Sequence, residues 1–243
     1  MGKKNVVNNY LDEQLGLIET WLNTFSQNRK PESLHALRVC IKKTKAILYF
    51  SETLFKKPFG KKKLDNLFHK AGTLRELYII ILLMQKSLPV SEKLTLPLMK
   101  KRTLLEQQFL EKIPRYIKEV RLFRKELSLP EKLPSKKVIL SYFKKREKRA
   151  DKKLHNRNRT TLHYYRRDIK KMMYVYEMLP KKLKKEIGLN KTKTDRLQEK
   201  IGLWHDTWTA FIFLSKQSFS KQIKNILSDL KEKEKKQFKK LFL

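Results

Sequence analysis

The sequence predicts an all-α fold. Only six glycines occur in 243 residues, no dipeptide typical of a hairpin turn is present, and long segments rich in Leu, Lys and Glu have helical periodicity. Prolines interrupt these segments, and Pro130 with Pro134 marks a break near the centre of the chain. We therefore expect four helices on each side of this break, joined by short loops as in antiparallel bundles.

Prolines also set the expected helix boundaries. Pro31, Pro89 and Pro180 lie near the edges of periodic segments. Pro97 and Pro114 fall inside the fourth helix, which should start late, kink or split, because proline cannot donate a backbone hydrogen bond. In chain order the expected helices are 5–27, 32–56, 61–87, 91–127, 135–155, 159–183, 191–217 and 219–240.

The second and sixth expected helices each carry an apolar stripe opposite a basic one. In the second, the apolar stripe includes Leu37 and Ile41, and in the sixth it includes Tyr165 and Ile169. If each apolar stripe is buried, the basic stripes face outward and could together line a cleft for a polyanion. The basic residues are His35, Arg38, Lys42 and Lys45 in the second helix, and Arg159, His163, Arg166 and Lys170 in the sixth.

The two halves of the chain repeat each other. LHYYRRDIKK, residues 162–171, matches LHALRVCIKK, residues 34–43, at an offset of 128. IGLWHDTWTAFIF, residues 201–213, pairs with AGTLRELYIIILL, residues 71–83, at an offset of 130. Two matches in the same order at nearly the same offset indicate an internal duplication. We expect a single domain over residues 1–243, with one four-helix unit at 5–129 and the other at 135–240.

This duplicated pattern resembles the CHAD family, whose name stands for conserved histidine α-helical domain. Each copy has a His-x-x-Arg helix with further basic residues, followed by a Gly-containing helix, and the resemblance spans residues 5–217. It implies two four-helix bundles related by pseudo-twofold symmetry, with a basic channel between them that binds inorganic polyphosphate. By position, the implied binding residues are His35, Arg38, Lys42, Lys43 and Lys45 in the first copy, and His163, Arg166, Lys170 and Lys171 in the second.

The second copy departs from the family pattern. Met173 stands where the counterpart of Lys45 should be basic, and Arg167, at the slot of Val39, is expected to compensate. Arg75 and His205 share their helix faces with apolar residues, so we expect them to be partly buried, paired with carboxylates and supportive of the basic helices. The same secondary set includes Glu76 and Asp206, and close approach of a neighbouring helix would explain two glycines inside helical patterns, Gly72 and Gly202.

The charge balance favours a polyanionic partner. The chain has 59 Lys and Arg against 24 Asp and Glu, a formal net charge of +35, while its 40% hydrophobic content argues against disorder. Cys40 is the only cysteine and lies on an apolar stripe, so no intrachain disulfide is expected. No signal-peptide core is evident, and the longest apolar run is too short to cross a bilayer. We expect a cytoplasmic protein, with association with polyphosphate granules as one use.

Three functions are compatible with these features. The leading hypothesis is non-catalytic binding of inorganic polyphosphate, without a cofactor or a metal. A nucleic-acid-binding protein is the first alternative, because phosphate contacts would supply the affinity in both cases. A phosphohydrolase acting on polyphosphate is the second, although no phosphate-binding loop or zinc motif is present. EKEKK, residues 232–236, resembles a motif of triphosphate tunnel enzymes, but those use it on a β-strand, and here we expect a charged helix.

Overall fold

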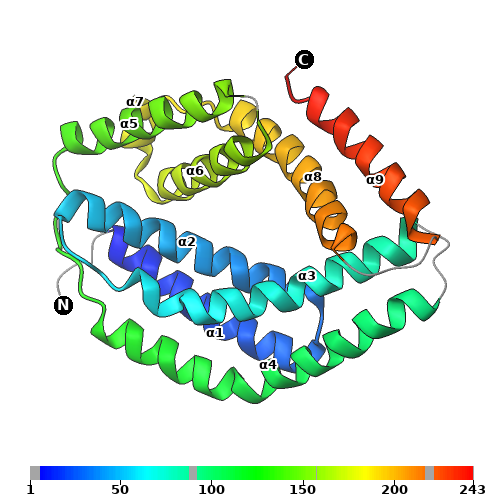
Figure 1. Ribbon diagram of the computed structural model, residues 1–243. Coiled ribbons are helices and arrows are strands. Elements are labelled where there is room, and N and C mark those ends of the chain that lie inside the picture. Colours follow the sequence, from blue (N-terminus) through cyan, green and yellow to red (C-terminus); the bar gives the residue numbers. More distant parts are fainter. Residues whose placement is uncertain (1–5, 88–91, 157, 217–221, 243) are drawn as a thin grey trace. The chain divides into compact units, whose positions relative to one another are not determined.

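The computed structural model describes residues 6–87, 92–156, 158–216 and 222–242. All regular elements among these residues are helical, which confirms the all-α prediction (Figure 1). In chain order they are α1 (Val6–Asn28), α2 (Pro31–Phe55), the short 3-10 helix η1 (Lys61–Leu64), α3 (Asp65–Ser87), α4 (Glu92–Glu126), α5 (Lys136–His155), α6 (Arg159–Met178), α7 (Lys181–Ile187), α8 (Lys191–Ser215) and α9 (Gln222–Lys239).

The proline-based expectations have mixed outcomes. The central break is confirmed, because residues 127–135 form no helix. The single helix expected at 159–183 is wrong: α6 ends at Met178, and α7 begins after Pro180, whose ring disfavours helical geometry in the residue before it. α4 neither splits nor starts late but bends along its course (Figure 1), as expected for a helix with Pro114 in its interior. The expected helix ends at 5, 91, 217 and 219 lie outside the described residues.

Backbone contacts divide the chain into two compact units. Unit 1 comprises residues up to Tyr142 together with Tyr174–Glu186, and unit 2 comprises Phe143–Met173 together with the chain from Ile187 onward. α5 and α6 therefore each contribute to both units. These units are defined by contacts, whereas the ranges 5–129 and 135–240 were drawn from the repeat, so the repeat-based ranges stay a prediction.

Unit 1 is built around the packing of α1 to α4. α1 packs against α2 and α4, and α3 packs against α2 and α4 (Figure 1). The apolar stripe of α2 lies in this core: Leu37 and Ile41 are fully buried, as are Ile18 of α1 and Leu74 of α3. Burial of that stripe fixes the rotation of α2 about its axis and turns its basic face away from the core.

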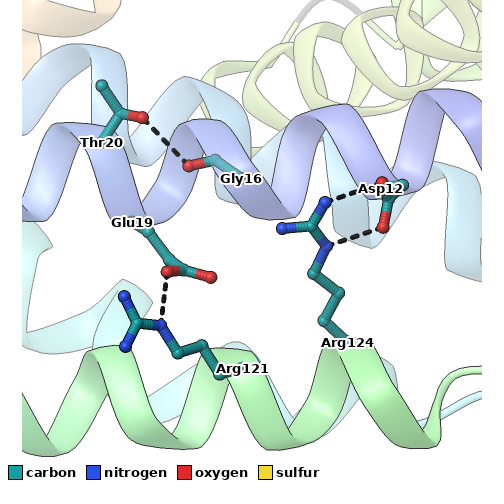
Figure 2. Close-up of polar contacts among 6 residues, drawn as sticks. All are labelled: Asp12, Gly16, Glu19, Thr20, Arg121 and Arg124. Carbon is teal, nitrogen blue, oxygen red and sulfur yellow. Dashed lines mark hydrogen bonds and ion pairs between the residues drawn. The ribbon is translucent and has the colours of Figure 1, made fainter.

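Ion pairs join the outer faces of α1 and α4. Figure 2 shows Arg124 donating from Nε and Nη2 to both carboxylate oxygens of Asp12, at 2.6 and 2.7 Å, and Arg121 donating to Glu19 at 2.8 Å. The side chains of these arginines are substantially exposed, so each pair contributes little, roughly 0–1 kcal/mol. The buried apolar residues supply most of the stability of unit 1.

Unit 2 has its core between α6, α8 and α9. α8 packs against α9, and Trp204 of α8 is completely buried. Its indole Nε1 donates to Glu234 of α9 at 2.7 Å, and the same carboxylate receives two hydrogen bonds from Arg159 of α6, both at 2.8 Å. One buried carboxylate thus ties three helices together, although it lies in the charged EKEKK stretch.

Candidate functional site

The first stripe, defined as His35, Arg38, Lys42 and Lys45, runs along the face of α2 opposite its buried residues. His35 is exposed and the other three side chains are half-buried. Val39 and Lys43 flank this face and are also half-buried. The stripe is therefore a partly covered surface on which cations are held by neighbouring groups from α3.

The Arg38 side chain lies on α3, where a glycine leaves room for it and a backbone carbonyl accepts its hydrogen bond. Its Nη1 donates to the backbone carbonyl of Phe68 at 2.5 Å. A Cβ atom at Gly72 would lie 2.9 Å from the Arg38 Cζ and closer still to Nη1. Gly72 is required because it leaves room for this guanidinium, whereas the sequence suggested close approach of a whole helix. Phe68 lies one turn before Gly72, so the carbonyl and the open surface form one seat for Arg38.

The phenyl ring of Phe68 gathers three cations of the first stripe. The Arg38 Cζ lies 4.1 Å from the ring centroid, the Lys45 Nζ 5.3 Å and the Lys42 Nζ 6.0 Å. A cation over an aromatic face is stabilised by about 0.5–1 kcal/mol at partly exposed sites. Phe68 was not among the residues selected from the sequence; its position one turn before Gly72 was the available signal.

The surroundings of Arg38 make its charge costly. Burial, together with the nearby positive charge of Arg75, lowers the pKa of Arg38 to about 10, although the negative charge of Glu76 acts in the opposite direction. The guanidinium is still protonated at neutral pH, so α2 and α3 hold two close positive charges that a bound anion would relieve. Arg75 is half-buried and Glu76 is exposed.

The remaining basic residues of this copy form ion pairs within unit 1. Lys45 pairs with Asp65 at the start of α3, and the Lys43 Nζ lies 3.6 Å from a carboxylate oxygen of Glu177. Both lysines remain partly exposed, so these pairs are weak and can be exchanged for an anionic ligand. The role of Lys43 and Lys45 in binding stays a prediction.

The second stripe, defined as His163, Arg166 and Lys170 on α6, repeats the arginine seat. Arg166 Nε donates to the backbone carbonyl of Gln198 at 3.3 Å. A Cβ at Gly202 would lie 2.9 Å from Arg166 Nη2, and Gln198 precedes Gly202 by one turn, as Phe68 precedes Gly72. Both units thus contain an arginine, a helical glycine beneath it and an accepting carbonyl one turn earlier, which supports the internal repeat inferred from the sequence.

His163 and His205 form a stacked pair in unit 2. Their ring centroids are 4.4 Å apart with an interplanar angle of 23°, and both rings are half-buried. The ring of His205 is also arranged edge-to-face with the rings of Trp204 and Trp208, and its Nδ1 lies 3.4 Å from Thr209 Oγ1. His205, expected in a supporting role, is thus the direct neighbour of His163, which was expected to bind ligand.

Other predicted residues of the second copy lie in varied surroundings. Arg159 is tied to Glu234, and Arg167 is exposed with its guanidinium 4.9 Å from the ring of Tyr164. Lys170 and Lys171 are half-buried, and Asp206 is exposed. Met173, at the position of Lys45, is only 6% exposed, so this slot lies in the core of the second copy. The ligand contacts assigned to these residues stay predictions.

Three further observations concern metal binding, the single cysteine and membrane insertion. Among the described residues, no group of three or more His, Cys, Asp or Glu side chains is arranged to hold a metal ion. Cys40 is buried, and burial raises the pKa of its thiol, which disfavours the reactive thiolate. Within the same described part of the chain, no helix has the length and apolar character needed to cross a membrane. The cleft between the two basic stripes stays a prediction.

Comparison with known proteins agrees with this architecture. The model of the CHAD domain family matches residues 9–215. The chain is similar to the crystal structure of the CHAD domain from the plant Ricinus communis, with 12% identity and a TM-score of 0.62, over 100% of this chain and 87% of that chain. At this identity the structural likeness concerns the fold alone. No curated protein sequence matches the chain.

Proposed function

The chain belongs to the CHAD domain family, and from this premise we propose that it binds inorganic polyphosphate through its basic stripes without chemically altering it. We place this function in the cytoplasm, with storage, scaffolding or targeting to polyphosphate granules as its uses. The observation that carries the proposal is the cation cluster of α2 and α3, in which Arg38 is held half-buried beside the like charge of Arg75.

Such a cluster is suited to a chain of phosphates. Each phosphate of the polymer carries negative charge at a short repeat, and the first stripe places cations along α2 one turn apart. Binding would relieve the repulsion between Arg38 and Arg75 and release counter-ions from the polymer, so affinity should fall steeply with salt.

The position of Phe68 favours polyphosphate over single-stranded nucleic acid. Proteins that bind single strands offer open aromatic faces on which bases stack. The Phe68 ring already has Arg38, Lys42 and Lys45 of the first stripe around it. Its role is to hold cations in place, which serves phosphate recognition without base recognition.

The test is a pair of charge reversals with equal net charge. Lys42→Glu with Lys170→Glu alters one lysine in each stripe and leaves both arginine seats intact. We expect polyphosphate affinity to fall by about tenfold or more and its salt dependence to become shallower, because fewer phosphates are neutralised. The control, Lys231→Glu with Lys233→Glu, changes exposed residues of α9 and should weaken binding far less. Equal losses would show that net charge alone drives binding.

Two outcomes would overturn the proposal in favour of its alternatives. Displacement of polyphosphate by RNA or DNA at equal phosphate concentration would favour a nucleic-acid-binding protein. Steady release of phosphate in the presence of a divalent metal, abolished by one carboxylate substitution, would favour a phosphohydrolase.

A further inference from the structure

Unit 1 contains a pocket that the basic stripe alone does not explain. It opens where the start of α2 meets the second half of α3 and the first half of α4. His35 and Arg75 line it, and so does Arg102 of α4, a residue outside the family-derived set. Three basic side chains from three separate helices thus converge on one opening.

The basic side of the pocket fits a group with more than one negative charge. The Arg102 guanidinium lies 5.2 Å from the ring centroid of Tyr78, and its buried Nε has no hydrogen-bond partner among the described residues. α2 begins at Pro31, which also lines the pocket, and no side chain caps this helix start. The positive end of the α2 dipole therefore adds to the three side chains.

Much of the remaining lining of the pocket is apolar, and inorganic polyphosphate cannot use it. Ile79, Ile81 and Leu82 line it together with the ring of Tyr78. The Tyr78 hydroxyl is hydrogen-bonded to Glu106, which fixes the ring. Leu82 is 48% exposed although it is a large aliphatic residue. Ligand pockets usually combine such an apolar wall with a few convergent polar groups.

We propose that this pocket binds a nucleoside polyphosphate. The phosphates lie against His35, Arg75 and Arg102, and the base packs on Tyr78, Ile79 and Leu82. The exposed carboxylate of Glu32, which lines the same opening, accepts hydrogen bonds from the ribose hydroxyl groups. The inference extends the proposed function, because His35 belongs to both the first stripe and the pocket, whereas Arg102 and Leu82 belong to the pocket alone.

Three probes separate the contributions of phosphate and base. ATP, inorganic tripolyphosphate and adenosine are titrated by calorimetry into the full chain, at fixed salt and without divalent cations. We expect ATP to bind about tenfold more tightly than tripolyphosphate, the factor gained when about 55 Å² of apolar surface leaves water. Adenosine alone should not bind measurably. Equal affinities for ATP and tripolyphosphate would overturn the inference.

Matched variants locate the effect in the pocket. Leu82→Ser should bring the affinity for ATP down to that for tripolyphosphate, whose own affinity should stay unchanged. Leu122→Ser is the control, because Leu122 is also 48% exposed but lies elsewhere, on α4. Arg102→Gln should weaken both ligands. An unchanged ATP preference in Leu82→Ser, or unchanged ATP affinity in Arg102→Gln, would contradict the assignment.

Long-chain polyphosphate, titrated into the same variants, distinguishes this inference from the proposed function. Leu82→Ser should bind the polymer like the native chain, and Lys42→Glu should lose polymer affinity while keeping the preference for ATP. If the native chain fails to bind the polymer but prefers ATP as expected, the proposed function fails and the nucleotide pocket stands. If the native chain binds the polymer but shows no preference for ATP, the nucleotide pocket fails and the proposed function stands.

Discussion

The two units hold their arginines in the same way but surround them differently. Arg38 and Arg166 each lie on a helical glycine and donate to the carbonyl one turn before it. The residues around this seat differ between the two units. We infer that the seat itself is part of the shared fold, whereas its neighbours determine the local charge around each arginine. The corresponding pairs are Lys45 and Met173, Phe68 and Gln198, and Arg75 and His205.

The helices that carry these arginines also begin differently. At the offset of 128, Pro31 at the start of α2 corresponds to Arg159 at the start of α6. Pro31 lines an open pocket, whereas Arg159 is joined to the buried Glu234 of α9. The start of α6 is thus anchored by a charged group, while the start of α2 is left accessible to ligand.

The largest expected effect breaks this anchor. Glu234→Gln should lower the free energy of unfolding by about 2 kcal/mol, because it leaves Arg159 without its charged partner and weakens the hydrogen bond from Trp204. Chemical denaturation checks this value. Glu232→Gln is the control, since Glu232 is exposed and paired only with Lys236 one turn away, and it should cost less than about 0.5 kcal/mol.

The pH dependence of this anchor gives a second readout. Burial alone would raise the pKa of Glu234, but hydrogen bonds from Arg159 and Trp204 outweigh it and hold the pKa below the ordinary value of 4.5. Its stabilisation is therefore complete above about pH 4.5 and is lost as the pH falls through the lower pKa of the folded state. The stability difference between native protein and Glu234→Gln should shrink in that acidic range. A constant difference would mean that the carboxylate charge is not what anchors α6.

The next effect tests whether the two arginine seats are equivalent. Alanine at an unobstructed helix position is about 1 kcal/mol more stable than glycine. At Gly72 the added methyl group would displace Arg38 from its hydrogen bond to Phe68, so Gly72→Ala should be destabilised by about 1–2 kcal/mol. In Gly202→Ala the added methyl group would meet only the end of the Arg166 side chain, so the effect on stability should be closer to neutral. Thermal and chemical denaturation provide the measurement.

Gly16 of α1 provides the matched control for these substitutions. A Cβ at Gly16 would make only ordinary contact, 3.7 Å from Arg124 Nη1, so Gly16→Ala should be stabilising. The expected order of stability is Gly16→Ala, then Gly202→Ala, then Gly72→Ala. If Gly72→Ala were as stable as Gly16→Ala, the glycine would not be needed to seat Arg38.

Much of this architecture was predictable from local patterns. The all-α fold follows from helical periodicity, and the equivalence of Arg38 and Arg166 follows from the repeat. The glycines inside helices indicated that something must approach closely, since glycine is otherwise unfavourable there. What the sequence could not identify was the approaching group, because an arginine can reach across several helical positions and its final contact depends on three-dimensional packing.

Other features have no local signature. Glu234 lies among alternating charges that predict a charged helix, and only the packing of α9 on α8 places this side chain inside. Arg102 was missed because its convergence with His35 and Arg75 depends on three helices meeting.

The wrong helix at 159–183, in contrast, had a clear local signal in Pro180. The sequence places this proline near the edge of a periodic segment, whereas in the structure it separates α6 from α7.

A smaller effect tests the role of the phenyl ring. Phe68→Leu should lower the free energy of unfolding by about 1 kcal/mol, because the ring stabilises the cations gathered around it. It should also weaken polyphosphate binding slightly, since the lysines would be less ordered. Gln198→Leu makes the corresponding change in unit 2, where Gln198 stands at the position of Phe68. It should be neutral or stabilising because the buried Gln198 Oε1 has no hydrogen-bond partner among the described residues. Equal losses in both variants would exclude a specific role for the ring.

The smallest expected effect is on the pH dependence of polyphosphate affinity, and it tests why unit 2 has His205 where unit 1 has Arg75. A bound anion favours the protonated form of a nearby imidazole, so the stacked pair of His163 and His205 should take up protons more readily when polyphosphate is bound. Affinity for polyphosphate, measured at constant ionic strength, should rise about threefold from pH 7.5 to 6.

His205→Arg makes unit 2 resemble unit 1 and should flatten this pH profile while raising affinity at pH 7.5. The ion pair of Arg159 and Glu234 in the same unit stays charged throughout this range, because the pKa of Arg159 is raised and that of Glu234 is lowered, so it cannot produce the slope. His155→Arg, on the exposed face of α5, is the control for an added charge and should leave the slope unchanged. If His205→Arg keeps the native slope, the pH response arises outside this pair, and the replacement of arginine by histidine in unit 2 has no role in binding.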